Sequence, residues 1–162
     1  MPQIAYVALG SNLGDKENNL RTALAHMKEA GIQIRKVSSF YRTAPYGVTD
    51  QPEFLNGVCE VLWNGDAESL LHTLLGIELA MGRQRKRHWG ERNIDLDLLL
   101  FGDEVIHSDD LNLPHPDMIH RSFVLEPLAE IAPQVIHPVY KKTIQTLWEE
   151  LQNQGQKPDC GQ

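Results

Sequence analysis

"RNIDLDLLLF", residues 92–101, is an apolar run of strand type that contains two carboxylates. Side chains alternate between the two faces of a strand, so we expect Asp95 and Asp97 to share one face with Leu99. The other face carries the remaining apolar side chains: Ile94, Leu96, Leu98 and Leu100. Carboxylates two residues apart lie roughly 6.6 Å from each other at the backbone and repel by about 2.5 kcal/mol at an effective dielectric constant of about 20.

Two explanations can account for this like-charge pair, and the stretch alone does not separate them. The strand can end at the rim of a sheet, where water or surface lysine and arginine side chains screen both carboxylates. Alternatively, the pair binds a hard cation, because Mg²⁺ takes carboxylate oxygens and fills its other positions with water and substrate phosphates. Asp95 and Asp97 are therefore candidate metal ligands.

A basic segment, residues 83–92, lies directly before the aspartate strand. Its cationic side chains are Arg83, Arg85, Lys86, Arg87 and Arg92. Taken alone, such a segment is more often a solvated surface. Beside a carboxylate pair, however, guanidinium groups suit a polyphosphate, because they neutralise the phosphate charge that a metal ion leaves uncompensated. The combination favours a phosphate-transfer site.

The order of the predicted elements indicates the fold. Apolar runs bounded by turn residues predict strands at 4–9, 32–41 and 54–63, with a long loop over 42–52. Two helices are predicted between N-capping aspartates and terminal glycines, from Asp15 to Gly31 and from Asp66 to Gly82. With the aspartate strand, this βαββαβ order predicts an α+β fold, a ferredoxin-like antiparallel sheet with two helices packed on one face.

The last third of the chain adds further elements to this sheet. It contains a loop at 112–118, a short helix within 121–133 and a helix within 143–152. We expect residues 1–162 to form a single domain, because this length suits one hydrophobic core. The polar residues 154–162 are expected to form a disordered tail.

Composition limits the function classes. The chain has 15 Lys plus Arg and 22 Asp plus Glu, and its net charge of −7 argues against nonspecific nucleic-acid binding. The sequence shows no secretory pattern and no apolar run long enough to cross a membrane, and its two cysteines lack metal or redox spacing. We therefore expect a cytoplasmic protein that binds small molecules and neither nucleic acid nor membrane. We also expect a monomer, although composition does not determine the oligomeric state.

Other candidate residues have commoner explanations beside the functional one. Glu78 lies beside the apolar face of the second helix, where an exposed boundary position is more usual than a ligand contact. Phe54 and Asn56 point the same way from one strand, which suits a planar heterocycle, although a core Phe beside a turn Asn is more common. Gly10 serves a tight turn, or lets a flat ligand approach the backbone. The segment 10–14, GSNLG, matches neither the P-loop nor the dinucleotide motif.

Six motifs occur in order from about residue 4 to residue 138: "ALGSNLGD", "SSFYRTAPYG", "QPEFLNGV", "IELAMGRQR", "WGERNIDLDLLLFG" and "LPHPDMIHRSFVLEPLAEIAP". In combination they closely resemble the 6-hydroxymethyl-7,8-dihydropterin pyrophosphokinase family. The resemblance implies an Mg-dependent diphosphotransferase of folate biosynthesis, which moves pyrophosphate from ATP to a pterin alcohol and leaves AMP. It also implies in-line attack of the pterin hydroxyl on the β-phosphorus of ATP.

The resemblance further implies roles for the matched positions. Two Mg²⁺ ions would be held by Asp95 and Asp97. ATP would contact Glu78, Arg83, Arg85, Trp89, Arg92, the backbone of Leu98, His115 and Arg121. The pterin would stack between Phe54 and Phe123 and contact Gly10, Thr43, Ala44, Tyr46, Asn56 and Trp89. The residues expected to act in catalysis are Arg83, Arg92 and Asp97, with Asp97 as the nearest candidate for a general base.

Three positions depart from the family pattern. Phe54 stands where Tyr is frequent, His88 where Arg is frequent, and Pro116 where an aromatic residue is common. None of these departures falls on the aspartate pair.

Two other function classes remain as alternatives. An RNA-binding RRM domain shares the βαββαβ order, but its central strand carries aromatic side chains where this chain has Asp95 and Asp97. An Mg-dependent phosphohydrolase would use the same carboxylates and would release phosphate without a pterin. Single-stranded RNA binding and phosphate release without pterin are the observations that separate these classes.

Overall fold

The computed structural model describes residues 2–43, 53–82 and 94–155. Within these ranges, an antiparallel sheet has the strand order β2-β4-β1-β5, and β3 also pairs with β4. Its strands are β1 (Gln3–Ser11), β2 (Gln33–Val37), β3 (Tyr41–Thr43), β4 (Phe54–Trp63) and β5 (Asp95–Phe101). A separate two-stranded sheet consists of β6 (Ile106–His107) and β7 (Asn112–Leu113).

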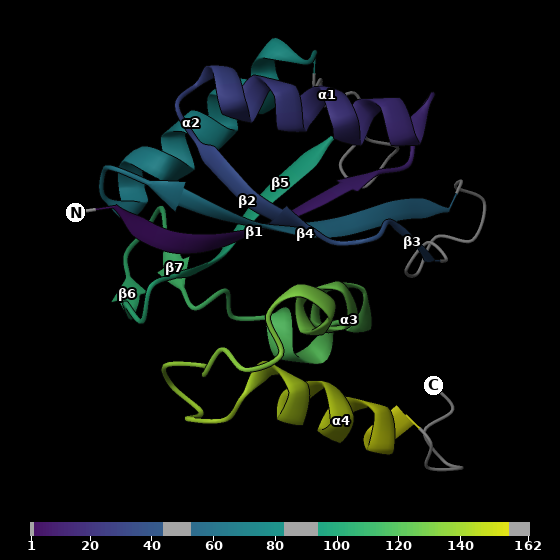
Figure 1. Ribbon diagram of the computed structural model, residues 1–162, viewed down its shortest axis with the longest axis vertical. Coiled ribbons are helices and arrows are strands. Elements are labelled where there is room, and N and C mark those ends of the chain that lie inside the picture. Colours follow the sequence, from purple (N-terminus) through teal and green to yellow (C-terminus); the bar gives the residue numbers. More distant parts are fainter. Residues whose placement is uncertain (1, 44–52, 83–93, 156–162) are drawn as a thin grey trace.

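Helices lie on both sides of the sheet (Figure 1). One face is covered by α1 (Lys16–Glu29) and α2 (Ala67–Ala80), and α3 (Ser122–Ile131) and α4 (Ile144–Gly155) lie on the other side. A 3₁₀ turn, Met118–His120, leads into α3. No helix in the described ranges has the length and apolar character needed to span a membrane.

The helix ends follow the predicted signals. The Asp15 side chain accepts a hydrogen bond from the Asn18 N–H at 3.1 Å, and Asp66 accepts one from the Ser69 N–H at 2.8 Å, so both predicted N-caps are confirmed. Gly31, just beyond α1, has φ +92°, which glycine adopts without a steric cost. α4 extends to Gly155 and includes two residues that the sequence assigned to the tail.

Each face of the sheet has its own hydrophobic core. Buried side chains under α1 and α2 include Val7, Leu9, Leu20, Met27, Leu70, Leu74, Leu96 and Leu98. Those on the α3 and α4 side include Tyr6, Val58, Leu99, Leu100, Met118, Leu125 and Leu147. The C-terminal end of β1 meets the N-terminal ends of β4 and β5, since Gly10 pairs with both Asn56 and Asp95.

A bulge in β5 interrupts the predicted alternation of side chains between the two faces of the sheet. Val7 pairs with Leu98 and Tyr6 pairs with Leu100, so Leu99 is an extra residue in the ladder. Leu98 packs under α1 and α2, whereas Leu99 and Leu100 both pack on the α3 and α4 side. The prediction that Leu100 shares a face with Leu98 is therefore wrong, because strict alternation ends at the bulge.

The predicted strand 32–41 is interrupted. β2 ends at Val37, and β3 begins at Tyr41 inside the stretch where the sequence predicts the change from strand to loop. At the interruption, the Ser38 hydroxyl accepts a hydrogen bond from the Val58 N–H at 2.9 Å, in place of a backbone carbonyl of the ladder. A serine that bonds the backbone in this way competes with regular strand pairing, which explains the break.

The carboxylate of Glu130 connects α3 to the segment that joins β2 and β3. It accepts hydrogen bonds from the Ser39 N–H at 3.0 Å, the Ser39 hydroxyl at 2.9 Å and the Tyr41 hydroxyl at 2.7 Å. Partial burial raises the pKa of the Glu130 carboxyl, but the hydrogen bonds from Tyr41 and Ser39 outweigh this, and the pKa is lowered. Burial and the bond to Glu130 raise the pKa of Tyr41 to about 12.

Glu130→Gln tests this connection through the pH dependence of stability. A carboxyl whose pKa is lowered by folding stabilises the protein above its unfolded pKa of about 4.3. That contribution disappears as the pH falls through the lower pKa of the folded state. We expect the wild-type Tm to exceed that of Glu130→Gln at neutral pH, and the difference to narrow below about pH 4 in thermal unfolding experiments. A Tm difference that is constant across this range would contradict the assignment.

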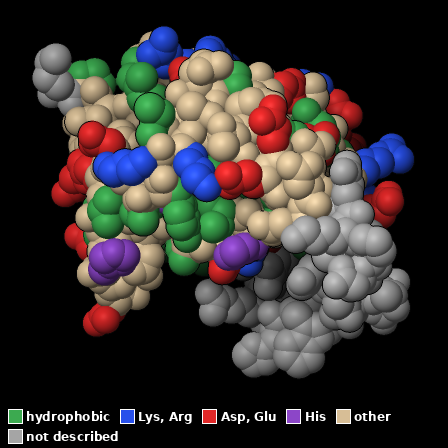
Figure 2. All heavy atoms as spheres, turned by 90° about the horizontal axis from the view of Figure 1, so that it is seen from below, with side chains coloured by type: hydrophobic (Ala, Val, Ile, Leu, Met, Phe, Trp, Pro, Cys, Tyr) green, Lys and Arg blue, Asp and Glu red, His purple; other side chains and the backbone are tan. Residues whose placement is uncertain are grey.

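Positively and negatively charged side chains both occur on the face of the molecule that carries α4. In the view from below, lysine and arginine side chains are interspersed with aspartate and glutamate rather than gathered in one basic area (Figure 2). The described residues on this face therefore offer no continuous basic patch for a nucleic-acid backbone.

Candidate active site

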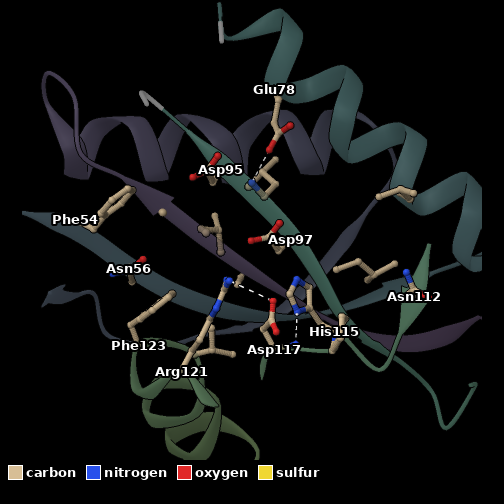
Figure 3. Close-up of a pocket in the computed structure, with 18 of the residues that line it drawn as sticks. Phe54, Asn56, Glu78, Asp95, Asp97, Asn112, His115, Asp117, Arg121 and Phe123 are labelled. Carbon is tan, nitrogen blue, oxygen red and sulfur yellow. Dashed lines mark hydrogen bonds and ion pairs between the residues drawn. The ribbon is translucent and has the colours of Figure 1, made fainter. Parts of the chain in front are cut away.

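A cavity of about 810 Å³ opens where β1, β4 and β5 meet, next to the N-terminus of α3 (Figure 3). Every predicted site residue within the described ranges lines it: Gly10, Thr43, Phe54, Asn56, Glu78, Asp95, Asp97, Leu98, His115, Arg121 and Phe123. The other predicted site residues lie outside the described ranges: Ala44, Tyr46, Arg83, Arg85, Trp89 and Arg92.

Asp95 and Asp97 extend from β5 into the cavity (Figure 3). Asp95 pairs across the sheet with Gly10, and Asp97 pairs with Ala8, so the two carboxylates are two rows apart in the regular part of the ladder. Asp95 is half-buried and Asp97 is exposed. The small side chains of the paired residues leave the sheet surface beside the carboxylates open to a ligand.

The donor set around this pair limits the type of metal site. The described ranges contain no group of three or more His, Cys, Asp or Glu residues arranged to hold an ion. These residues therefore do not form a closed zinc site, which needs three or four protein ligands. Mg²⁺ commonly takes one or two carboxylates and completes its coordination with water and substrate phosphates. The chemistry of Asp95 and Asp97 fits such an ion better than a permanently bound metal.

A planar amide and two aromatic rings line the opposite end of the cavity (Figure 3). The Asn56 Nδ2 donates a hydrogen bond to the Thr43 hydroxyl at 2.7 Å, which fixes the orientation of the amide. Phe54 precedes Asn56 by two residues on β4, and Phe123 lies at the start of α3. Phe54 therefore lines the cavity instead of the core, and Asn56 lies in a strand instead of a turn, so the commoner explanations are wrong for both.

Gly10 makes room for this amide. A Cβ atom at Gly10 would lie 2.9 Å from the Asn56 Oδ1, closer than such atoms normally approach. The absence of a side chain at this position is thus required by the place of Asn56 in the cavity wall. Close approach, rather than an unusual backbone conformation, explains the glycine.

Positively charged groups line the cavity at the N-terminus of α3. Arg121 is the N-cap of this helix, and its guanidinium lies 3.4 Å from the Asp117 Oδ2 and 5.7 Å from the centre of the Phe123 ring. A helix N-terminus presents backbone N–H groups and a partial positive charge. Together with the guanidinium, it favours an anionic group of a ligand at this wall.

His115 is held in a defined orientation beside Asp97. Its backbone N–H donates to the Leu99 carbonyl at 2.9 Å, and its Nδ1 accepts a hydrogen bond from the Asp117 N–H at 3.2 Å. Burial lowers the pKa of the imidazole; the Asp97 charge opposes this shift and Arg121 adds to it. The ring is therefore neutral near pH 7, with its proton on Nε2, where it can donate to a ligand oxygen.

Glu78 has a different environment from the one its sequence position suggests. It is only 5% exposed, it lines the cavity, and its Oε2 accepts a hydrogen bond from the Leu96 N–H at 2.7 Å (Figure 3). The expected exposed boundary position is therefore wrong. Because the backbone groups of alternate residues point to the same side of a strand, those of Leu98 face the same outer edge of β5 as those of Leu96.

Several lining residues were not predicted from the sequence: Leu71, Leu75, Asp110, Asn112, Pro116, Asp117 and Ser122. Leu71 and Leu75 repeat at helical spacing on α2, which in the sequence is indistinguishable from a core stripe. The exposed position of Leu75, with 44% of its surface accessible, shows that this part of the stripe faces the cavity mouth. Asp110 and Asn112 belong to no motif, and nothing in the sequence indicates their place in the cavity wall.

Comparison with known proteins identifies the family. The family model described as 7,8-dihydro-6-hydroxymethylpterin-pyrophosphokinase (HPPK) matches residues 6–133. The chain belongs to this pyrophosphokinase family. It is 48% identical over 136 residues to the 2-amino-4-hydroxy-6-hydroxymethyldihydropteridine pyrophosphokinase of Bacillus subtilis, covering 83% of this chain and 81% of that protein. The protein of the same name from Synechocystis is 43% identical over 148 residues, covering 91% of this chain and 75% of that protein.

Solved structures of the pyrophosphokinase family share the fold. The HPPK-DHPS protein of Plasmodium falciparum, crystallised with pteroate, has a TM-score of 0.76 at 18% identity, and the match covers 95% of this chain. The wild-type structure of that protein without a named ligand has a TM-score of 0.76 at 17% identity. This chain spans 43% and 45% of those two chains. The family resemblance drawn from the motifs is confirmed, and all the predicted site residues fall within the matched range 6–133.

Proposed function

We propose that this chain transfers pyrophosphate from ATP to the hydroxyl group of 6-hydroxymethyl-7,8-dihydropterin, giving AMP and the pterin diphosphate in folate biosynthesis. Its membership of the pyrophosphokinase family supports the reaction class. One observation carries the proposal: a carboxylate pair, an amide and two aromatic rings line the same cavity. A nucleotide and a heterocycle can thus meet in one site.

The pterin is assigned to the aromatic end. Phe54 and Phe123 supply faces on which a flat, electron-poor ring can stack, and such stacking contributes about 1–3 kcal/mol per ring. Asn56 carries both a donor and an acceptor, which match the amide-like edge of a pterin. Thr43 orients Asn56 through the 2.7 Å hydrogen bond, and Ala44 and Tyr46 complete the proposed set from outside the described ranges.

The ATP phosphates are assigned to the carboxylate end. Asp95 and Asp97 would hold two Mg²⁺ ions, which would neutralise the charge of the phosphates. Arg121 and the Nε2–H of His115 would bind the remaining phosphate oxygens. Arg83, Arg85, Trp89 and Arg92 belong to the same proposal.

The nucleoside is assigned to the edge of β5. Glu78 holds this edge in place through the Leu96 N–H, and the backbone groups of Leu98 face the same side. Leu71 and Leu75 add an apolar wall from α2, which suits the flat faces of a purine. This arrangement would orient the triphosphate toward the aspartate pair.

The protein's own residues would catalyse the transfer mainly by positioning and charge neutralisation. The pterin hydroxyl must approach the β-phosphorus in line with the departing AMP, and stacking between Phe54 and Phe123 would fix that approach. Asp97 is the nearest candidate for a general base, although a carboxylate engaged by a metal is a weak one. Arg83, Arg92 and Arg121 would stabilise the charge on the transferred group.

The fold, the oligomeric state and the cellular location are also part of the proposal. The antiparallel order β2-β4-β1-β5 with α1 and α2 on one face supports a ferredoxin-like arrangement with added C-terminal elements. A monomeric state is a further part of the proposal. A cytoplasmic location is the corresponding expectation for a protein with a buried free thiol at Cys59.

One experiment tests the function directly. The protein is incubated with ATP, Mg²⁺ and 6-hydroxymethyl-7,8-dihydropterin, and AMP is quantified by chromatography, with omission of pterin or Mg²⁺ as controls. We expect AMP and pterin diphosphate in equal amounts, and neither without pterin. Phosphate release without pterin would instead support the phosphohydrolase, and retention of single-stranded RNA on a filter would support the RNA-binding alternative.

Gly10→Ala tests the proposed pterin end. The added methyl group would displace the Asn56 amide, so we expect the KM for pterin to rise about tenfold while the KM for ATP stays within about twofold. Gly76→Ala is the matched control, because a Cβ atom there meets nothing within 4 Å. Steady-state kinetics with each substrate varied in turn gives both constants. An unchanged KM for pterin would show that Asn56 does not contact this substrate.

A further inference from the structure

The two walls of the proposed pterin site belong to different elements. Phe123 is on α3, whereas Thr43 is on β3, a strand of only three residues that pairs with β4 within the described ranges. So short an edge strand is weakly held by its own ladder. Thr43, which orients Asn56, is therefore fixed relative to Phe123 only if a further contact holds β3 against α3.

Glu130 makes that contact. Its two carboxylate oxygens accept the Ser39 N–H at 3.0 and 3.1 Å, the Ser39 hydroxyl at 2.9 Å and the Tyr41 hydroxyl at 2.7 Å. A carboxylate can accept all of these bonds, and bonds to a charged acceptor are stronger than neutral ones. One side chain of α3 thus holds the start of β3 in place through hydrogen bonds.

The geometry relates this contact to the cavity. Glu130 and Phe123 are seven residues apart on α3, so they lie on the same face of the helix, about 10.5 Å apart along its axis. On β3, Tyr41 and Thr43 are two residues apart and share one face of the strand. Tyr41 lies directly opposite Asn56 in the ladder, and Thr43 lies opposite Phe54.

We propose that Glu130 is a positioning residue for the pterin substrate: its carboxylate sets the distance between the Thr43–Asn56 edge and the Phe123 ring. The inference rests on the pterin site proposed above. Glu130 lies at the surface and does not line the cavity. Its effect on the reaction is therefore indirect and should fall on one substrate only, because the carboxylate pair and the edge of β5 are held by other contacts.

The test compares kinetic constants for the two substrates. In Glu130→Ala, we expect the KM for pterin to rise about tenfold, with the KM for ATP within about twofold and kcat within about threefold of wild type. Glu130→Gln keeps one acceptor oxygen and should show a smaller rise. Glu126→Gln, one turn earlier on α3, is the matched control: it removes a charge that acts on Tyr41 but leaves the hydrogen bonds of Ser39 and Tyr41 to Glu130 in place, and it should behave as wild type.

A merely structural role predicts a different pattern. It would reduce the active fraction only, so kcat would fall with both KM values unchanged, and this result would overturn the proposal. A lower Tm is expected in either case, because the hydrogen bonds of Glu130 also stabilise the fold. An equal rise in both KM values would also overturn it. If Glu130→Ala fails to fold, Tyr41→Phe removes only the 2.7 Å bond and should still raise the KM for pterin severalfold; no rise in that variant counts against the proposal.

Phe123→Ala separates the failure of this inference from failure of the pterin site. If Phe123→Ala raises the KM for pterin and Glu130→Ala does not, the site stands and the positioning role is overturned. If neither variant changes the KM for pterin, the assignment of the aromatic end is itself overturned, and the role of Glu130 falls with it.

Discussion

Asp97→Asn is expected to lower kcat for AMP formation by about 10³-fold while the protein stays folded. The carboxylate is one of two proposed Mg²⁺ ligands, and the amide that replaces it has a similar size but no charge. Because Asp97 is exposed at the cavity, its replacement removes little buried surface, and we expect Tm to change by only a few degrees or less. Saturating-substrate kinetics and thermal unfolding measure the two effects separately.

Two further measurements make the result specific for the metal site. Asp103→Asn removes the same charge from the turn after β5, outside the cavity, and should leave kcat unchanged. Raising the Mg²⁺ concentration should partly restore the kcat of Asp97→Asn, because the carboxylate of Asp95 can still bind the ion. AMP formation by Asp97→Asn at the wild-type rate would show that the carboxylate pair is only a solvated sheet rim.

Phe123→Ala is expected to raise the KM for pterin by about 10- to 100-fold, which corresponds to the loss of about 1–3 kcal/mol of ring stacking. The KM for ATP should change far less, because the aspartate pair and Glu78 lie on β5 and α2. Arg121, beside the Phe123 ring, is the proposed ATP contact that the substitution can affect. Varying each substrate at saturating concentrations of the other measures both constants. Phe54→Ala should have a similar effect, since its ring would contact the opposite face of the pterin.

The partial burial of Phe123 requires a control for folding. The ring packs against the core on the α3 and α4 side, so Phe123→Ala also leaves a cavity there. Phe123→Leu keeps most of the apolar volume but lacks an aromatic face, and it should keep Tm closer to wild type while the KM for pterin remains raised. Equal increases in the KM values for both substrates would point to general disruption and not to stacking.

The predictable part of the fold and site depended on local signals. Asp15 and Asp66 act as caps through bonds within one helical turn, and such bonds can be inferred from neighbouring residues. Asp95 and Asp97 could be assigned to one side of a strand because alternation holds across Leu96, the one residue between them. The family resemblance then assigned roles to 11 of the 23 described residues that line the cavity.

The features that could not be predicted depend on contacts distant in the sequence. The bulge at Leu99 is determined by the register of β5 against β1, and the break at Ser38 by a bond to Val58. Glu78 has the same local surroundings as an exposed helix residue, and only the position of Leu96 explains its burial. Glu130 was likewise missed, because its partners precede it by about 90 residues, as Ser39 and Tyr41 show.

The bond from Glu78 to β5 has a consequence for solubility. In the described sheet, β5 is a terminal strand, and the unpaired N–H groups of such a strand are a template for strand addition by another molecule. Glu78 occupies the Leu96 N–H with a carboxylate, which blocks a continuous intermolecular ladder and places negative charge beside the strand. The bond that holds the proposed nucleoside edge is thus also expected to oppose strand addition at Leu96.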